Sequence, residues 1–430
     1  MSGFKRVRKF LIPAFLIVIL AVSILAVYMS YSSGNRSKAD PNAYVGIAFC
    51  GNTTAEAKLL IDRTKTYTNL FVLDSGRNPI SENQSSVEEI CDYAVSKGLN
   101  VIINLGIKDA INTTGYNWFW HQQSPDSIKQ RWTERWGDKF LGIYYNDEPG
   151  GIQLDINWGD WYRSFGDELN EMYPPHPAGT AMYQIYLKML DAMYNGSKPQ
   201  DYNLEANFFI QNVLKEDPGL AALKTAGITT FTSDYGLYWF DYLGGYDVLF
   251  AETGWNASLA QQIALVKGAA RLQDKEWGAI ITWKYGSAPY LDTGDQMYNQ
   301  MLTAYQAGAK YIMIFNYPIL DGNDYGVMND EHFIALERFW NDITQKKFAD
   351  LSTPEAAMVL PSNYGWGMRH PNDTIWGFWS TDEKSQPIGI AISKLLAQYG
   401  TSLDIVYDDP AYPVTKGNYK NVYYWNSTGI

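Results

Sequence analysis

Eight short, almost continuously apolar segments are the feature of this sequence that most constrains its fold. They alternate with segments of helical periodicity. Strands of a parallel sheet are covered on both faces, and therefore read as apolar runs rather than as alternating patterns. The eight segments are Tyr44–Phe49, Asn69–Leu73, Asn100–Leu105, Phe140–Tyr145, Ile228–Thr232, Asp247–Ala251, Gly278–Trp283 and Tyr311–Phe315.

Eight buried strands joined by crossovers predict an α/β fold of the (β/α)8 TIM barrel class. An open doubly wound sheet is the alternative. No glycine-rich phosphate fingerprint follows the first strand, which argues against a Rossmann-type nucleotide site. The chain has 430 residues, enough for a barrel of ~250 residues and a smaller unit. We predict a barrel over residues 42–350, ending with the helix Glu331–Gln345.

The residues after the barrel have a different character. Residues 351–430 contain three predicted strands and one helix, which predict a small α/β domain packed against the barrel. The strands are Ala356–Leu360, Leu403–Tyr407 and Asn421–Tyr424, and the helix is Ile388–Tyr399.

The N-terminus resembles a membrane anchor. Basic residues at positions 5, 6, 8 and 9 precede an apolar run from Phe10 to about Tyr31. A run of ~20 apolar residues is long enough to cross a bilayer as a helix. Positive charge before it places that end in the cytoplasm. We therefore predict a signal-anchor helix within residues 1–31, a linker over residues 32–41 and an extracellular bulk; a cleaved signal peptide is the alternative.

Two further patterns accompany export. Eight Asn-x-Ser/Thr sequons are candidate glycan acceptors in an exported chain, and so predict a glycoprotein. The two cysteines, Cys50 and Cys91, either pair or remain as two buried thiols.

Charge and motif content exclude several function classes. The net charge is -12, whereas a nucleic-acid partner favours a basic face. The four histidines are scattered and give no metal-ligand spacing. A divalent cation held by Asp74, Glu148 and Asp234 is the weaker alternative. No Gly-x-Ser-x-Gly elbow is present. We predict no cofactor.

Chemistry in such barrels is carried by the residues just past the strands. Two glutamates stand out there: Glu148 after the fourth strand and Glu252 after the sixth. Glycoside cleavage needs one protonated and one ionised carboxyl group. Glu148, behind two tyrosines, is the candidate acid, and the Pro-Gly-Gly that follows it is typical of a loop rather than a helix cap. Glu252 is the candidate nucleophile or base, with the two carboxyl groups ~5–10 Å apart.

Other side chains at the strand ends are candidates for substrate binding. Asp147 competes for the role of second carboxylate, because an adjacent Asp-Glu pair also suits substrate-assisted hydrolysis of N-acetyl sugars. Sugar rings stack on aromatic side chains, and many aromatic residues, Trp132 and Trp136 among them, are placed by the sequence pattern near this face. The candidate binding residues are Asp74, Asn146, Asp147, Asp234, Tyr235, Trp255, Trp283, Lys284, Tyr285 and Asn316.

These segments resemble glycoside hydrolase-type barrels. Asn146–Pro149 (NDEP) resembles the Asn-Glu-Pro acid/base motif that ends strand four in the large clan of retaining glycosidases. Glu252–Trp255 (ETGW) resembles the nucleophile segment of some members. Two departures stand: Asp147 is inserted between Asn146 and Glu148, and Glu252 follows the sixth predicted strand, whereas the nucleophile of the clan follows the seventh.

The C-terminal segment carries a second resemblance. The stretch MVLPSNYGWGMRHPNDTIWGFW and the later LDIVYDDP resemble the amidotransferase-like domain that follows the barrel in certain β-galactosidases. The resemblance covers roughly residues 354–430, and no cysteine nucleophile is present there.

The sequence therefore predicts a membrane-anchored extracellular glycoside hydrolase that cleaves O-glycosidic bonds of a glycan. The alternative is a non-catalytic surface protein in which the same barrel binds polysaccharide or belongs to a surface layer.

Overall fold

A computed structural model gives the structure of the chain. It describes residues 43–74, 79–104, 123–155, 200–254, 258–317, 320–345, 348, 353–415 and 417–427. The predicted anchor and linker lie outside these residues, as does Trp255. None of the helices within the described ranges has the length and apolar character needed to span a bilayer. The anchor therefore stays a prediction.

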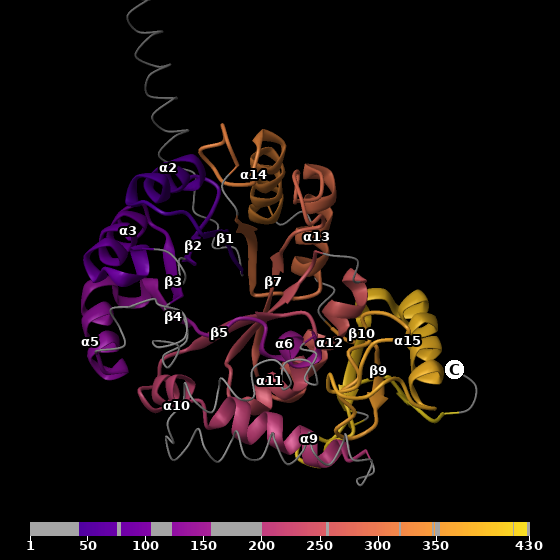
Figure 1. The fold of residues 1–430 in the computed structure, drawn as a ribbon. Helices are drawn as coiled ribbons and strands as arrows, with labels where there is room; N and C mark the ends of the chain where they lie inside the picture. The colour runs from indigo at the N-terminus through magenta and orange to yellow at the C-terminus, as the bar shows by residue number, and fades with distance from the viewer. Residues whose placement is uncertain are drawn as a thin grey trace, which may run out of the picture.

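Eight parallel strands form a closed barrel in which β1 pairs with both β2 and β8 (Figure 1). This confirms the predicted barrel, and the open doubly wound sheet is wrong. The strands are β1 Tyr44–Phe49, β2 Leu70–Leu73, β3 Asn100–Asn104, β4 Phe140–Tyr144, β5 Thr230–Asp234, β6 Val248–Glu252, β7 Glu276–Ile281 and β8 Tyr311–Asn316.

Helices surround the barrel on its outer side (Figure 1). The α-helices are α2 Thr54–Thr64, α3 Gln84–Ser96, α5 Pro125–Trp136, α6 Pro149–Asp155, α9 Tyr202–Phe208, α10 Pro218–Thr225, α11 Tyr238–Gly244, α12 Leu259–Leu272, α13 Gly294–Gln306 and α14 Asp330–Thr344. Short helical turns are η1 Pro79–Glu82 and η3 Gly137–Lys139, and η4 Phe209–Lys215 is a π-helical segment.

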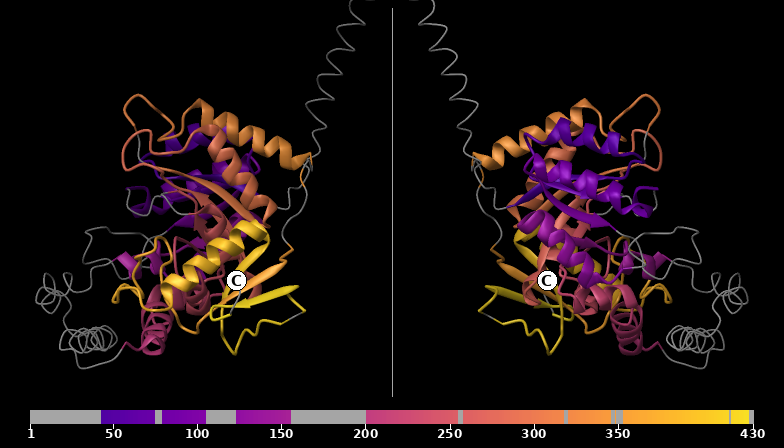
Figure 2. Two further views of the ribbon diagram at one scale, coloured as in Figure 1. Left: turned by 90° about the vertical axis from the view of Figure 1, so that its right-hand side faces the viewer. Right: turned by 90° about the vertical axis from the view of Figure 1, so that its left-hand side faces the viewer.

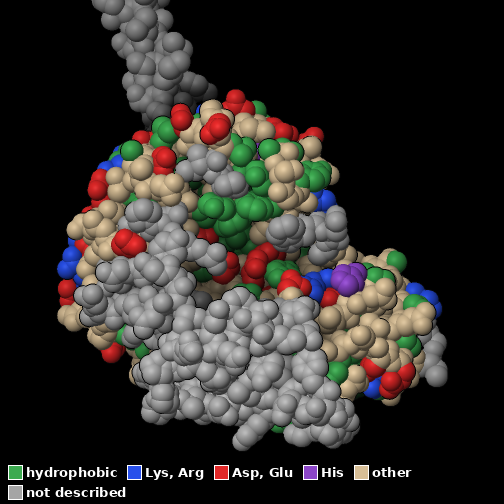
Figure 3. Space-filling view, in the orientation of Figure 1, with side chains coloured by type: hydrophobic (Ala, Val, Ile, Leu, Met, Phe, Trp, Pro, Cys, Tyr) green, Lys and Arg blue, Asp and Glu red, His purple; other side chains and the backbone are tan. Residues whose placement is uncertain are grey.

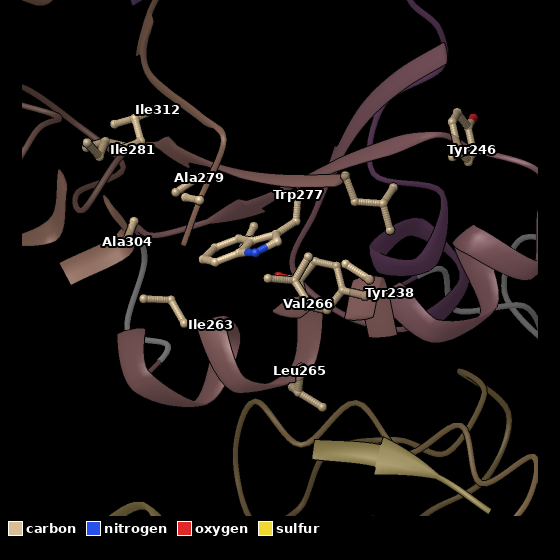
Figure 4. Close-up of a cluster of buried hydrophobic side chains, with 14 of the residues drawn as sticks. Tyr238, Tyr246, Ile263, Leu265, Val266, Trp277, Ala279, Ile281, Ala304 and Ile312 are labelled. Carbon is tan, nitrogen blue, oxygen red and sulfur yellow. The ribbon is translucent and has the colours of Figure 1, made fainter. Parts of the chain in front are cut away.

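The barrel interior is packed with aromatic and branched side chains. Phe231, Phe250 and Tyr311 form the centre, with ring centroids 5.4–5.9 Å apart. Glycine makes room for neighbouring strands: a Cβ on Gly142 would lie 2.2 Å from the carbonyl oxygen of Thr229. Gly142 also has φ +149°, beside a register shift between β3 and β4. A second layer fills the space between strands and helices, where Trp277 of β7 packs against Val266 and Ile263 of α12 (Figure 4).

The remaining chain forms a small unit on one flank of the barrel, as the side views show (Figure 2). Its parallel sheet has the order β10-β9-β11, and α15 packs on it. The elements are β9 Ala356–Leu360, α15 Ser385–Tyr399, the turn η5 Gly400–Ser402, β10 Leu403–Tyr407 and β11 Asn421–Tyr424.

A buried ion pair joins this unit to α12 of the barrel. Lys267 Nζ lies 3.1 Å from Asp404 Oδ1, with the two side chains 2% and 0% exposed. Arg271 and Tyr419 also donate to Asp404 Oδ2, at 2.8 and 3.0 Å. Gly268 brings the backbones together, because a Cβ there would lie 2.6 Å from Ile405 O. The two units therefore share one continuous hydrophobic core.

We predict that Asp404→Asn lowers the free energy of unfolding by about 3–5 kcal/mol, because it leaves the Lys267 ammonium buried without its counter-charge. Denaturant unfolding measures the change. The matched control is Asp330→Asn, which removes an exposed partner of Arg63 (3.0 Å, 90% exposed at Asp330) and should change little. Equal effects of the two substitutions would show that the buried pair does not hold the units together.

Candidate active site

The carboxyl ends of the strands surround a hollow at one mouth of the barrel. Figure 3 shows hydrophobic side chains on one wall of this hollow and acidic side chains on the other. Acidic residues follow β2 and β4 and end β6, and aromatic residues follow β7 and β8.

Cys50 and Asp74 directly follow β1 and β2, and Asn104 ends β3. Asn104 Nδ2 donates to Asp74 Oδ1 at 2.5 Å, and Cys50 Sγ lies 3.7 Å from Asp74 Oδ2. Burial, and then the charge of Asp74, raises the pKa of the Cys50 thiol well above its usual range. Cys50 therefore stays a thiol and is a poor nucleophile. Cys91 lies in α3, and both cysteines are free, so the pairing alternative is wrong.

The turn after β4 presents Asp147 and Glu148 to the hollow. Asn146 and Glu148 both have left-handed backbones, with φ 55° and 51°. Asparagine adopts this conformation readily, whereas for glutamate it is uncommon and typical of functional sites. The turn is tied to β5, because Glu148 N–H donates to Ser233 O at 3.1 Å and Thr232 Oγ1 donates to Asn146 O at 2.7 Å.

The interpretation of Pro149-Gly150-Gly151 as a loop is wrong. These residues open α6, and the carbonyl of Glu148 accepts the N–H of Ile152 at 2.8 Å. The carboxylate that caps this helix belongs to Asp234. Its oxygens accept from the backbone N–H groups of Gly150 and Gly151 at 2.6 and 2.8 Å.

Asp234 differs from its expected role in substrate binding. It is 0% exposed and also accepts from the N–H groups of Tyr235 and Gly236, at 2.7 and 3.1 Å. Burial raises its pKa to about 7, against the opposing effect of these N–H donors. Because both oxygens are occupied inside the protein, Asp234 holds the turn that carries Glu148 and does not face the hollow.

Glu252 ends β6 and meets Glu148 directly. It is 3% exposed, and Ser233 Oγ donates to its Oε1 at 2.7 Å. Burial raises the pKa of Glu252 well above its usual range, and the charge of Glu148 and a side-chain hydrogen bond with Glu148 raise it further. Burial and the neighbouring Glu148 therefore favour the protonated form of Glu252, and the two carboxyl groups lie close enough for a side-chain hydrogen bond. The two carboxyl groups are thus closer than the expected 5–10 Å.

A second hydrogen-bond network holds Asp147, whose side chain is exposed. Tyr144 Oη donates to Asp147 Oδ1, and Ser233 Oγ lies 3.2 Å from the same atom. Burial, and then the charge of Asp147, raises the pKa of Tyr144 well above its usual range, so the phenol keeps its proton. Ser233 thus stands between Asp147 and Glu252 and contacts both.

Aromatic residues occupy the opposite part of the mouth. The ring of Trp283 stacks on Tyr317 with centroids 5.9 Å apart and planes at 9°, and contacts Tyr290 at 4.8 Å. Tyr285 and Tyr317 are 47% and 44% exposed. We call these four residues, Trp283, Tyr285, Tyr290 and Tyr317, the aromatic platform. Lys284 lies within it, and its backbone N–H donates to Tyr290 O at 2.7 Å.

Two other candidate binding residues have structural contacts instead. Asn316 is 5% exposed, and its Oδ1 accepts the N–H of Val327 at 3.0 Å, which fixes the chain beyond β8. Tyr235 is half-buried, and its Oη donates to Asp155 Oδ2 at 2.7 Å. Trp132 and Trp136 lie on α5, where they donate to Glu88 and Asp92 of α3, so they are part of the outer layer and not of the mouth.

Within the ranges that the structure describes, no cluster of three or more His, Cys, Asp or Glu side chains is arranged to hold a metal ion. Asp234 is also not available as a ligand of the divalent cation considered above, because both of its carboxylate oxygens accept from backbone N–H groups.

No family model matches this sequence, and no curated protein matches it. Similar solved structures include GH5_18 from Bifidobacterium longum subsp. longum, with 9% identity, 90% of this chain and 98% of that chain covered, and a TM-score of 0.47. PbGH5A, a glycoside hydrolase family 5 enzyme from Prevotella bryantii, has 11% identity and a TM-score of 0.31. The match covers 70% of this chain and 97% of that chain.

A 3-hexulose-6-phosphate synthase is also similar, with 11% identity and a TM-score of 0.32. The match covers 68% of this chain and 99% of that chain. Several of the similar structures are thus glycoside hydrolase barrels, but barrels of other chemistry stand beside them. Likeness this distant does not decide the reaction. The resemblance of residues 354–430 to an amidotransferase-like domain stays a prediction.

The raised pKa of Glu252 predicts how stability depends on pH. Its pKa is raised above the ordinary value of 4.5 in the folded protein, so the folded chain holds a proton that the unfolded chain releases. This contribution is complete below about pH 4.5 and is lost as the pH rises. We expect the free energy of unfolding to fall by about 1–3 kcal/mol more in the wild type than in Glu252→Gln when the pH rises from 5 to 8.

Urea unfolding at a series of pH values measures this difference. Glu134→Gln, on the exposed face of α5, is the control and should follow the wild type. Parallel curves for the wild type and Glu252→Gln would mean that Glu252 is ionised in the folded protein.

Proposed function

We propose that this protein is a glycoside hydrolase in which Glu148 is the general acid. The observation that carries the proposal is the close contact, with a side-chain hydrogen bond, between buried Glu252, whose pKa is raised, and half-buried Glu148 at the mouth of the barrel. Cleavage of a glycosidic bond at neutral pH needs a carboxyl group that still holds a proton. The raised pKa of Glu252 favours a proton on this pair, and Glu148 is its more exposed member.

The chemistry follows from which carboxyl group meets solvent. Glu252 is almost completely buried, whereas Glu148 is only partly so. When a glycosidic oxygen binds beside Glu148, the proton of the pair moves to Glu148, and Glu148 donates it to that oxygen. The bond from this oxygen to the anomeric carbon breaks as the proton is transferred. The Glu148 carboxylate then accepts a proton from the water that completes hydrolysis, which restores the pair.

The second carboxylate has two candidates. The sequence favours Glu252, but retaining enzymes separate the two groups by ~5–5.5 Å and inverting enzymes by ~6.5–9.5 Å. A hydrogen-bonded pair is closer than either. Asp147 is exposed and is oriented by Tyr144 and Ser233. We therefore favour Asp147 as the second carboxylate, with Glu252 as the residue that keeps the proton on the pair.

This assignment suits substrate-assisted hydrolysis of an N-acetylhexosaminide. The acetamido carbonyl oxygen attacks the anomeric carbon, while Asp147 accepts a hydrogen bond from the acetamido N–H and stabilises its developing positive charge. Glu148 protonates the departing oxygen. An adjacent Asp-Glu pair provides both functions from one turn, and no nucleophilic carboxylate is needed on the other face of the sugar.

The aromatic platform supplies binding for a further sugar ring. Its exposed tyrosine faces lie at the ends of β7 and β8, across the mouth from Glu148 on β4. Sugar C–H faces pack on such rings, and Lys284 adds a cationic hydrogen-bond donor. Asp74 and Asn104 form the polar floor on the side of the first strands.

The location of the reaction is also a proposal. The apolar segment from Phe10 to about Tyr31 supports a single-pass anchor with residues 42–430 outside the cell. A surface glycan is then the expected partner, and the sequons are then accessible to glycosylation. The non-catalytic alternative uses the same platform and hollow to bind polysaccharide without turnover.

We predict that Glu148→Gln lowers kcat by about 10²–10⁴-fold and leaves glycan affinity nearly unchanged, because the amide has no acidic proton to transfer. Residues 41–430 are assayed on a panel of aryl glycosides, and binding is measured by calorimetry. Glu134→Gln is the control for a change of charge. Unchanged turnover in Glu148→Gln would remove Glu148 from the acid role, and binding without any turnover in the wild type would favour the surface-binding alternative.

A pair of substitutions separates the two candidates for the second carboxylate. Asp147→Asn should lower kcat on N-acetylhexosaminides by about 10²-fold or more, because the charge that stabilises the acetamido group is lost. Glu252→Gln should instead retain more activity and shift the basic limb of the kcat/KM pH profile to lower pH, because the shared proton is lost. If Glu252→Gln is the more damaging change and Asp147→Asn is mild, Glu252 is the nucleophile.

A further inference from the structure

The C-terminal unit reaches the turn that carries Glu148. Between β9 and α15, residues 361–380 form an arm that lies against α6, the helix that begins directly after Glu148. The arm has its own internal order, since Trp366 pairs with Ile375, and Ile375 with Trp379, in antiparallel bridges. Trp376 is fully buried and packs on Phe240 of α11 at 4.7 Å.

Each of the last three residues of α6 is bound by this arm. Gln153 Nε2 donates to Trp376 O at 2.9 Å, and Thr374 Oγ1 donates to Leu154 O at 3.2 Å. Arg369 Nη1 donates to Asp155 Oδ1 at 2.6 Å. The arm thus provides a donor for one of the last backbone carbonyls of the helix, which have no partner within the helix, and binds two side chains beside it.

Arg369 is the most constrained of these contacts. Its Nε and Nη2 donate to the two oxygens of Asp373 at 2.8 and 2.7 Å, and the Asp373 side chain is 1% exposed. The guanidinium also lies over the ring of Tyr235, 5.4 Å from its centroid. Tyr235 in turn packs against Gly151, where a Cβ would lie 2.2 Å from the ring, and donates to Asp155. A fixed fork of this kind holds its partners in one geometry.

We propose that Arg369, through Asp155 and Tyr235, is a positioning residue that fixes α6 and so the approach of Glu148 to the substrate. Helix α6 has only seven residues and is held at its start by Asp234 and at its end by the arm. A helix this short is not stable by itself, so its orientation depends on these two attachments. The proposal gives the C-terminal unit a function in the reaction through its contacts with α6. It rests on the proposed function, because it takes Glu148 as the reacting acid.

The test uses Asp155→Ala, since Asp155 is 53% exposed and its removal leaves no buried charge without a partner. Arg369→Lys is the second variant; it keeps the charge near Asp373 but loses the fork. Asp330→Ala is the matched control, because it removes another Arg–Asp contact between two elements far from α6 in the sequence. For each variant we measure hydrogen exchange of the amides of residues 150–155. We also measure kcat and KM on the substrate that the wild type cleaves best.

We expect exchange of these amides to rise at least tenfold in Asp155→Ala, with kcat lowered about 5–20-fold and KM changed less than twofold. Arg369→Lys should lie between this variant and the wild type, and Asp330→Ala should match the wild type. Unchanged exchange and unchanged kcat in Asp155→Ala would overturn the proposal. If exchange is faster in Asp155→Ala but the wild type has no glycosidase activity, the role of the arm in holding α6 stands and the proposed function is refuted. The failure of this proposal and the failure of the proposed function are therefore distinguishable.

Discussion

The carboxylate of Asp234 is the interaction on which the candidate site depends. It accepts two N–H groups at the start of α6 and two from its own loop, so it joins the turn after β4 to the turn after β5. The two residues before it on β5, Thr232 and Ser233, bind the backbone of the turn and the carboxyl groups of the site. One strand end therefore determines where the reactive groups of two neighbouring strands lie.

This arrangement is costly for folding. Glu252, Asp234 and Asp241 are all buried carboxyl groups with raised pKa values, and Asp241 borders Asp234 from α11. Ionised carboxylates packed this closely would repel one another, which favours their protonated forms in the folded protein. The backbone of Glu148 adds strain. Such costs are typical of functional sites, and they are offset elsewhere, here by the packed barrel and the buried contact between α12 and the small sheet.

The barrel was predictable because buried parallel strands have a strong local signal. All eight predicted segments overlap the observed strands, and β1 coincides with its prediction. The helices α2, α5, α6 and α11 were not predicted. Helix α5 buries two tryptophans through hydrogen bonds to acidic residues of α3, a tertiary contact that composition does not reveal. Helix α6 has glycine, a poor helix former, at its second and third positions, and it is held by Asp234 at its start and by the arm at its end.

The site was only partly predictable for a related reason. Position after a strand locates a side chain at the mouth but does not say whether it faces the hollow or the protein, which is why Asp234 and Asn316 were interpreted as binding residues. Ser233 was missed although a signal existed: it lies two residues after Phe231, which points into the barrel, and side chains of a strand alternate. The departure from the glycosidase clan also has a structural basis, because Glu252 does end the sixth strand.

The position of Glu252 one strand earlier than in that clan has a geometric consequence. Adjacent strand ends lie close together, and β5 is the only strand between β4 and β6. Its small residue Ser233 lets the two glutamates meet, whereas a larger side chain there would separate them. A pair that meets can share a proton but leaves no room between its members for a sugar ring. Under the proposed function, the ring would therefore lie on the open side of Glu148, towards Asp147 and the aromatic platform, with the reacting carbon nearer Asp147 than Glu252.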